Sequence, residues 1–157
     1  MDKPHIKAAV VCGTAFFFLF IISLISFVII EGETVKRTFF FPHDIYGTLN
    51  SEIRKLPYKD TPEENIALYI KEILLGPATY INASLVPEST RIRTILYRHD
   101  TVYVDFGEEI LFTEDIPVSF EKSIKTLVKS VYFNFPSVEN VIVTVNGQQI
   151  REAVHNG

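Results

Sequence analysis

The longest hydrophobic run in the chain lies near its N-terminus. Residues 8–30 are 23 consecutive residues without a charge, rich in Phe, Ile, Leu and Val. With a rise of about 1.5 Å per residue, a helix over this run would be about 35 Å long, and the hydrocarbon core of a bilayer is about 30 Å thick. We therefore predict a transmembrane helix at 8–30, with residues 1–7 as a cytoplasmic N-terminus.

The charges that flank this run predict its orientation. Lys3 and Lys7 precede it, whereas Glu31 and Glu33 follow it. Because basic residues are retained on the cytoplasmic side, the N-terminus is expected inside and the rest of the chain outside. A cleaved signal peptide is the alternative, but its apolar core is usually only about 7–15 residues long and ends in a small-x-small site. Residues 27–31 offer no such site, so we predict a retained single-pass signal-anchor.

Beyond a polar linker at 31–36, apolar and polar residues alternate in short segments that are typical of strands. The alternation is clearest at 101–106 and weakest at 48–56. Pro42, the pair His99-Asp100 and the pair Asn146-Gly147 mark the breaks between segments. Strands are predicted at 37–41, 48–56, 90–97, 101–106 and 141–145, with a short return strand at 148–150.

Two segments instead have apolar residues at helical spacing. Thr61 and Glu64 form the sequence pattern of a capping box, and Pro62 between them suits the first helical position. This helix is expected over 62–75, because Gly76-Pro77 would end it. A second amphipathic helix is expected over 117–132, with Asp115 as its cap.

The order of these elements predicts an α+β domain over 37–150, followed by a tail at 151–157. We expect a two-layer sandwich, with two helices on one face of a mostly antiparallel sheet.

Charge and cysteine content exclude several functions for this outer part. Removing Asp2, Lys3 and Lys7 from the 19 acidic and 15 basic side chains leaves 18 and 13, a net charge of −5. Phosphate binding favours a basic surface, so nucleic acid is not expected as a partner. The single cysteine, Cys12, lies in the apolar run and is predicted to be an unmodified thiol. Neither a disulfide nor a cysteine metal site is therefore possible after residue 30.

No group of residues in the sequence converges on a reaction. His43, His99 and His155 fall in predicted turns or in the tail, and no Gly-x-Ser-x-Gly motif is present. We therefore predict no catalytic residue, no cofactor and no metal ion. An acidic segment could hold Ca²⁺ or supply the carboxylate pair of a hydrolase, but it lacks the alternating ligands and central glycine of a calcium loop. A solvated rim is the favoured interpretation of these residues: Asp105, Glu108, Glu109, Glu114 and Asp115.

The predicted second helix carries a basic stripe. Lys122, Lys125 and Lys129 are spaced i, i+3 and i+7, so they share one side of the helix. The stripe is a candidate interaction surface for an anionic glycan, lipid headgroups or an acidic protein. The alternative is the ordinary solvated face of an amphipathic helix.

Short motifs follow one another along the outer part of the chain at 74–77, 85–87, 102–106, 126–127, 135–138 and 141–147. In their order and spacing they resemble the GerM domain family of sporulation and spore germination proteins. The resemblance implies an extracytoplasmic, non-enzymatic α+β domain, similar to the ring-building domains of secretion and sporulation channels. Its matching residues imply scaffold roles for Gly76, Pro77, Asp105, Phe106, Asn146 and Gly147. This sequence departs from the family in having one copy of the domain, no lipoprotein cysteine, and Gly107 where a serine is common.

Together these features predict a domain anchored in the bacterial cytoplasmic membrane, with a scaffold or assembly role in a cell-envelope complex. It would bind other envelope proteins through an exposed sheet edge or the second helix, and a homo-oligomer is left open. The alternative is a peptidoglycan-binding module that supports an amidase or another wall enzyme, with Lys122, Lys125 and Lys129 facing the polymer.

Overall fold

The computed structural model describes residues 4–30 and 33–150, and the chain divides into two compact units with the boundary after Glu33. The first unit holds helix α1, Pro4–Ile30, which includes the helix expected at 8–30. Its side chains at Phe16, Phe17 and Phe18 are exposed. Among the described residues, no helix has both the length and the apolarity of a membrane-crossing segment.

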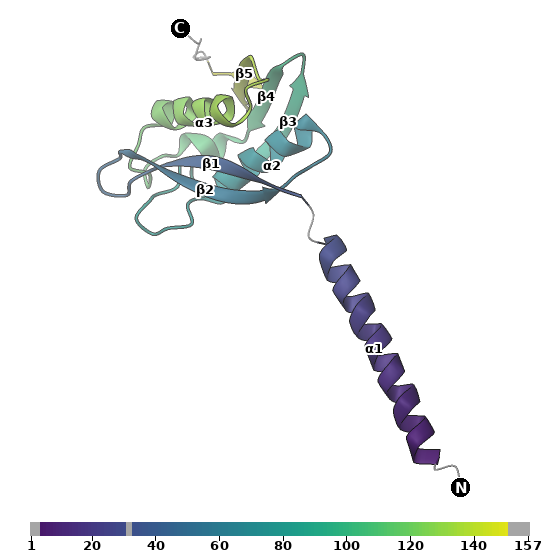
Figure 1. The fold of residues 1–157 in the computed structure, drawn as a ribbon. Coiled ribbons are helices and arrows are strands. Elements are labelled where there is room, and N and C mark those ends of the chain that lie inside the picture. The colour runs from purple at the N-terminus through teal and green to yellow at the C-terminus, as the bar shows by residue number, and fades with distance from the viewer. Residues whose placement is uncertain (1–3, 31–32, 151–157) are drawn as a thin grey trace. The chain divides into compact units, whose positions relative to one another are not determined.

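The second unit has the alternation of strands and helices expected for an α+β domain (Figure 1). Its first strand begins at Thr34, inside the expected linker, and the tail at 151–157, which includes His155, lies outside the described residues. The elements are β1 Thr34–Pro42, β2 Leu49–Pro57, α2 Pro62–Leu74, β3 Ile92–Arg98, β4 Thr101–Phe106, the 3₁₀ turn η1 Glu108–Leu111, α3 Phe120–Asn134, β5 Asn140–Val145 and β6 Gln148–Gln149.

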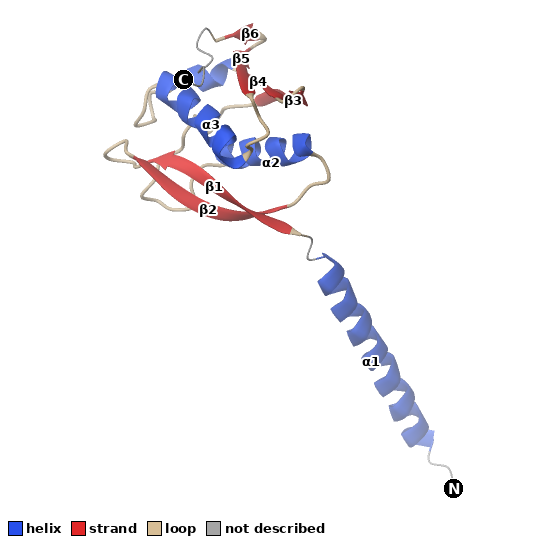
Figure 2. Ribbon diagram, turned by 45° about the horizontal axis from the view of Figure 1, so that its top comes forward, coloured by secondary structure: helices blue, strands red, loops and turns tan. Residues whose placement is uncertain are grey.

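The strands form two sheets, so the prediction of a single sheet was wrong, although three of the four strand pairs are antiparallel as expected. β1 and β2 pair only with each other, whereas the second sheet has the order β3-β4-β5-β6. β4 and β5 are parallel because α3 carries the chain back between them, and a parallel pair requires such a crossover. The helices α2 and α3 lie between the two sheets (Figures 1 and 2), and α3 contacts both β1 and β5.

Aromatic residues from β1 and the helices fill the space between the sheets. Phe39 and Phe41 of β1 are fully buried, and the Phe39 ring lies 4.7 Å from that of Tyr69 on α2. Full burial of one such side chain stabilises the fold by about 1.5–3 kcal/mol. This packing attaches the β1–β2 hairpin to the helices although it shares no hydrogen-bonded edge with the second sheet.

The ends of the helices show where local sequence determines local structure. The predicted capping box is present: the Glu64 amide donates to Thr61 Oγ1 at 3.2 Å, and the Thr61 amide donates to Glu64 Oε2 at 3.3 Å. Helix α3 differs, because it is capped by Ser119 and not by Asp115. A cap must accept from an amide two or three residues ahead, and Ser119 is in extended backbone immediately before the first helical residue.

Candidate interaction surface

The outer edge of β1 is covered at Thr38 by one side chain. The Asn134 amide reproduces the pairing of a missing strand: its Oδ1 accepts from the Thr38 amide at 2.9 Å, and its Nδ2 donates to the Thr38 carbonyl at 2.7 Å. The Tyr69 hydroxyl also donates to that carbonyl at 2.8 Å. Asn134 is itself buried at the end of α3, so a neighbouring chain cannot add to β1 at this point.

The edges of the second sheet are also limited. At β3, the Tyr97 amide donates to the Glu63 carboxylate of α2 at 2.9 Å. At the other side, β6 is only two residues long. Short edge strands and side chains placed across an edge are both devices that discourage pairing with another chain.

The outer edge of β2 has no comparable cover. Thr38 directs both of its backbone groups away from β2, so its opposite residue, Ile53, is in a non-hydrogen-bonded pair and directs its own groups away from β1. By the alternation of an antiparallel ladder, the same holds for Ser51 and Lys55. In the described part of the chain, no hydrogen bond reaches the outward backbone groups of these three residues.

The side chains of β2 have an inverted polarity. Glu52 and Arg54 point inward and are largely buried, at 11% and 18% exposed. Ile53 between them is 71% exposed, and the side chains of Ser51 and Lys55 are exposed on the same face. A strand that covers a core usually shows the opposite arrangement. Inward charges and an outward apolar residue thus distinguish β2 from the other strands.

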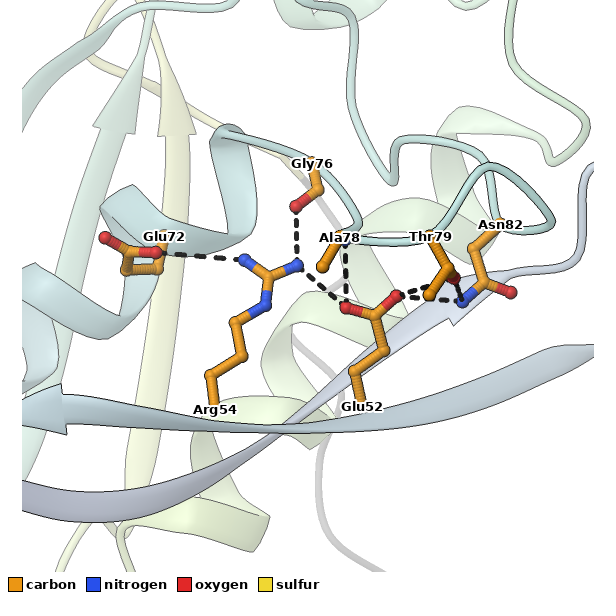
Figure 3. Close-up of polar contacts among 7 residues, drawn as sticks. All are labelled: Glu52, Arg54, Glu72, Gly76, Ala78, Thr79 and Asn82. Carbon is orange, nitrogen blue, oxygen red and sulfur yellow. Dashed lines mark hydrogen bonds and ion pairs between the residues drawn. The ribbon is translucent and has the colours of Figure 1, made fainter.

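The inward charges hold a loop above the strand. Figure 3 shows Glu52 and Arg54 rising from β2 toward the segment that follows α2. Arg54 donates to Glu52 at 2.9 Å and to the Gly76 carbonyl at 2.7 Å, and its guanidinium lies 4.8 Å above the Phe39 ring. Glu52 in turn accepts from the Ala78 amide at 3.1 Å, the Thr79 hydroxyl at 3.1 Å and the Asn82 amide at 3.0 Å. These contacts hold the loop in place and support β2 on its inward-facing side.

The environment of Glu52 determines its charge. Burial opposes ionisation, but hydrogen bonds from Arg54, Ala78, Asn82 and Thr79 outweigh it and hold the pKa of Glu52 at about 2, compared with an ordinary 4.5. The carboxylate is therefore ionised throughout the physiological range, and the ion pair with Arg54 persists.

A groove of about 760 Å³ borders the anchored loop. Tyr80, which is 96% exposed, and Phe112 line it, together with the carboxylates of Glu88 and Asp115. Two of its polar side chains, Thr79 and Asn82, are already engaged by Glu52.

The basic stripe is less available than its spacing indicates. The Lys122 ammonium donates to the Gly47 carbonyl at 2.8 Å, and Lys125 forms an ion pair with Glu121 one turn earlier. Lys129 is exposed. The structure therefore does not present three equivalent cations to a polymer or a membrane.

Three carboxylates of the acidic segment make contacts within the domain. Asp105 accepts from the Thr144 hydroxyl at 2.7 Å and from the Gly147 amide at 2.8 Å, and both hydrogen bonds lower its pKa. Glu109 pairs with Arg91 at 3.2 Å, Glu108 lies 3.5 Å from the Asn146 amide, and Glu114 and Asp115 are exposed. Within residues 4–30 and 33–150, no three His, Cys, Asp or Glu side chains are grouped to hold a metal ion.

The other expected scaffold residues lie at turns and in the core. Gly76, at φ +82°, ends α2 beside Pro77, and Asn146-Gly147 forms the tight turn before β6 with both residues at positive φ. Phe106 is fully buried. The glycine at 107, where the family commonly has serine, has a steric explanation. A Cβ there would lie 2.0 Å from Glu109 Oε2, so a serine would displace that carboxylate. His99 lies in a turn, whereas His43 forms an isolated β-bridge with Asn82 immediately before the turn at 44–46.

Sequence reasoning missed Asn134 and the pair Glu52 and Arg54. Asn134 lies beyond the expected end of the second helix, and its signal is an amide four residues after Ser130 on an otherwise apolar face. The strand at 48–56 was only loosely patterned because its charges face inward. The inverted polarity of this strand, with charged residues at the inward positions, was the signal in the sequence for Glu52 and Arg54.

Comparisons with known proteins agree with this fold. A family profile described as "Germane: Sporulation and spore germination" matches residues 38–151. The tandem GerMN domains of the sporulation protein GerM from Bacillus subtilis are similar in structure, with a TM-score of 0.55 and 18% identity. That match covers 79% of this chain and 44% of the tandem chain.

The first GerMN domain of the same protein has a TM-score of 0.53 and 19% identity, and the match covers 79% of this chain and 92% of that domain. At this identity the structural likeness shows the fold alone. No curated protein matches the chain.

Proposed function

Because the chain belongs to the Germane family of sporulation and spore germination domains, we propose that it is a non-enzymatic assembly domain of a bacterial cell-envelope complex. It joins protein components by strand addition at the outer edge of β2. The observation that carries this proposal is the uncovered backbone of Ser51, Ile53 and Lys55. An extended segment that pairs with these residues gains main-chain hydrogen bonds, which is the basis of recognition by β-augmentation.

The structure around β2 suits this role. The network of Glu52 and Arg54 holds the strand and the following loop in place, so the ordering cost of binding is small. Ile53 offers an exposed apolar side chain at the centre of the edge. The basic stripe does not favour the peptidoglycan alternative, because Lys122 and Lys125 have contacts within the domain.

We further propose that residues 8–30 tether this domain to the outer face of the cytoplasmic membrane. The support is the sequence, namely 23 uncharged residues with Lys3 and Lys7 before them and Glu31 and Glu33 after them. Protease added to intact protoplasts should digest the domain. A domain that is digested only after lysis would overturn this topology.

Cross-linking in membranes tests the assembly role. A photoreactive side chain at Ser51 should give discrete protein adducts, and Ile53→Pro should abolish them, because proline removes an amide that points away from β1 and leaves β1–β2 pairing intact. Ile53→Val is the matched control, since it keeps the amide and should retain the adducts. If the Ser51 photoprobe gives only monomer in a chain that keeps Ile53, the proposed function is contradicted.

A further inference from the structure

We infer that the occupant of the β2 edge is β2 of a second copy of this chain. The two strands pair antiparallel about a two-fold axis at Ile53 and join two hairpins into one four-stranded sheet. This inference rests on the proposed function and identifies the partner at the same edge.

The geometry follows from the direction of the backbone groups. Ser51, Ile53 and Lys55 direct their N–H and C=O groups outward, so they are the residues that can form hydrogen-bonded pairs with a new strand. With the axis at Ile53, this residue faces Ile53 of the partner subunit. Ser51 then faces the partner's Lys55, and Lys55 faces the partner's Ser51. The exposed apolar side chains meet at the centre of the sheet.

The charge pattern selects this register over its neighbours. With the axis at Ile53, Glu52 lies opposite the partner's Arg54 on the inner face of the sheet. Moving the axis by one residue toward the N-terminus places Glu52 opposite the partner's Glu52. Moving it the other way places Arg54 opposite the partner's Arg54. Like charges directly opposite are unfavourable, so of these three registers only the one centred on Ile53 places opposite charges across the new pair.

The resulting sheet is limited at its ends by Pro57 and at its edges by Asn134. Pro57 has no amide hydrogen, so pairing does not extend beyond β2, and Leu49 faces the partner's Pro57 at the opposite end. The outer strands of the joined sheet are the two copies of β1, and Asn134 covers each of them at Thr38. A two-fold pair therefore uses both β2 edges, and Asn134 interrupts strand pairing at Thr38 on each remaining β1 edge.

Cysteine cross-linking in the full-length chain tests the register. In a Cys12→Ser background, Ile53→Cys brings two thiols across the axis, where Cα atoms of a hydrogen-bonded pair are about 5.5 Å apart and a disulfide can form. Ser51→Cys is the matched control, because its two copies would lie roughly 13 Å apart along the strands. Under mild oxidation in membranes we expect a covalent dimer from Ile53→Cys and monomer from Ser51→Cys. Equal cross-linking of both variants, or of neither, would overturn the pairing.

A charge-swap experiment covers the case in which oxidation perturbs the edge. Ile53→Lys and Ile53→Glu should each self-associate about fivefold more weakly than the parent chain, and a mixture of the two should recover association. Tyrosine fluorescence checks folding, since all seven tyrosines lie beyond α1. Unchanged association of both single variants would refute the two-fold axis at Ile53. An adduct of the Ser51 photoprobe with a different envelope protein would refute self-pairing and retain the proposed function, whereas absence of any adduct would refute both.

Discussion

The ion pair of Glu52 and Arg54 should dominate the acid sensitivity of this domain. Its contacts place the pKa of Glu52 at about 2 in the folded chain, compared with 4.5 for an ordinary glutamate. Because the folded-state pKa is lowered, the ionised carboxylate stabilises the fold above pH 4.5. That stabilisation is lost as the pH falls from 4.5 toward 2.

The magnitude follows from the same contacts. A pKa difference of this size corresponds to about 3 kcal/mol, at 1.36 kcal/mol for each pH unit. Solvent screening along the open side of the loop reduces the expected contribution to about 1–2 kcal/mol. Glu52→Gln removes the charge and keeps the shape of the side chain, so it should lower the free energy of unfolding by this amount at pH 7. The difference between the two chains should fall to less than about half of that value by pH 3.

Urea unfolding measures this difference directly. Tyrosine fluorescence reports on the second unit alone, because α1 contains no tyrosine and the chain has no tryptophan. Glu88→Gln is the matched control, since Glu88 is exposed in the same loop region. A Glu52→Gln deficit that is independent of pH between 7 and 3, or that equals that of Glu88→Gln, would refute the reasoning.

Three further substitutions test other parts of the account by urea unfolding. Asn134→Leu leaves the partly buried Thr38 amide and carbonyl without their amide partner, and it should cost about 2–3 kcal/mol; a neutral effect would show that this side chain does not cover the β1 edge at Thr38. Gly76→Ala, at φ +82° and with its Cβ 2.9 Å from Ser84 Oγ, should cost about 1–2 kcal/mol, and no loss would argue against the left-handed helix end. Thr61→Ala removes the capping box and should cost about 1 kcal/mol; equal stability would contradict its role.

Local signals in the sequence predict most of the individual elements. The capping box at Thr61, the stop at Gly76 and the Asn146-Gly147 turn each depend on a few adjacent residues, and each is present in the structure. Alternation likewise predicts the pair of strands on either side of His99-Asp100. These features need no knowledge of distant contacts.

The arrangement of the sheets and the candidate surface depend on distant contacts. Nothing local to β1 shows that Asn134, almost a hundred residues later, occupies its edge. The parallel pairing of β4 and β5 follows from the path of α3, which spacing alone does not predict. The strand pattern of β2 was hard to recognise because the charged side chains of Glu52 and Arg54 face inward. There they bind the loop that follows α2.

Residue-resolved amide exchange tests the central claim most directly. In dilute monomer, the amides of Ser51, Ile53 and Lys55 should exchange quickly, whereas those of Glu52 and Arg54, which pair with β1, should be protected. When the chain is assembled in membranes, all five amides should become protected. Slow exchange of Ile53 in the monomer, or fast exchange that persists after assembly, would contradict an uncovered β2 edge that serves as the assembly surface.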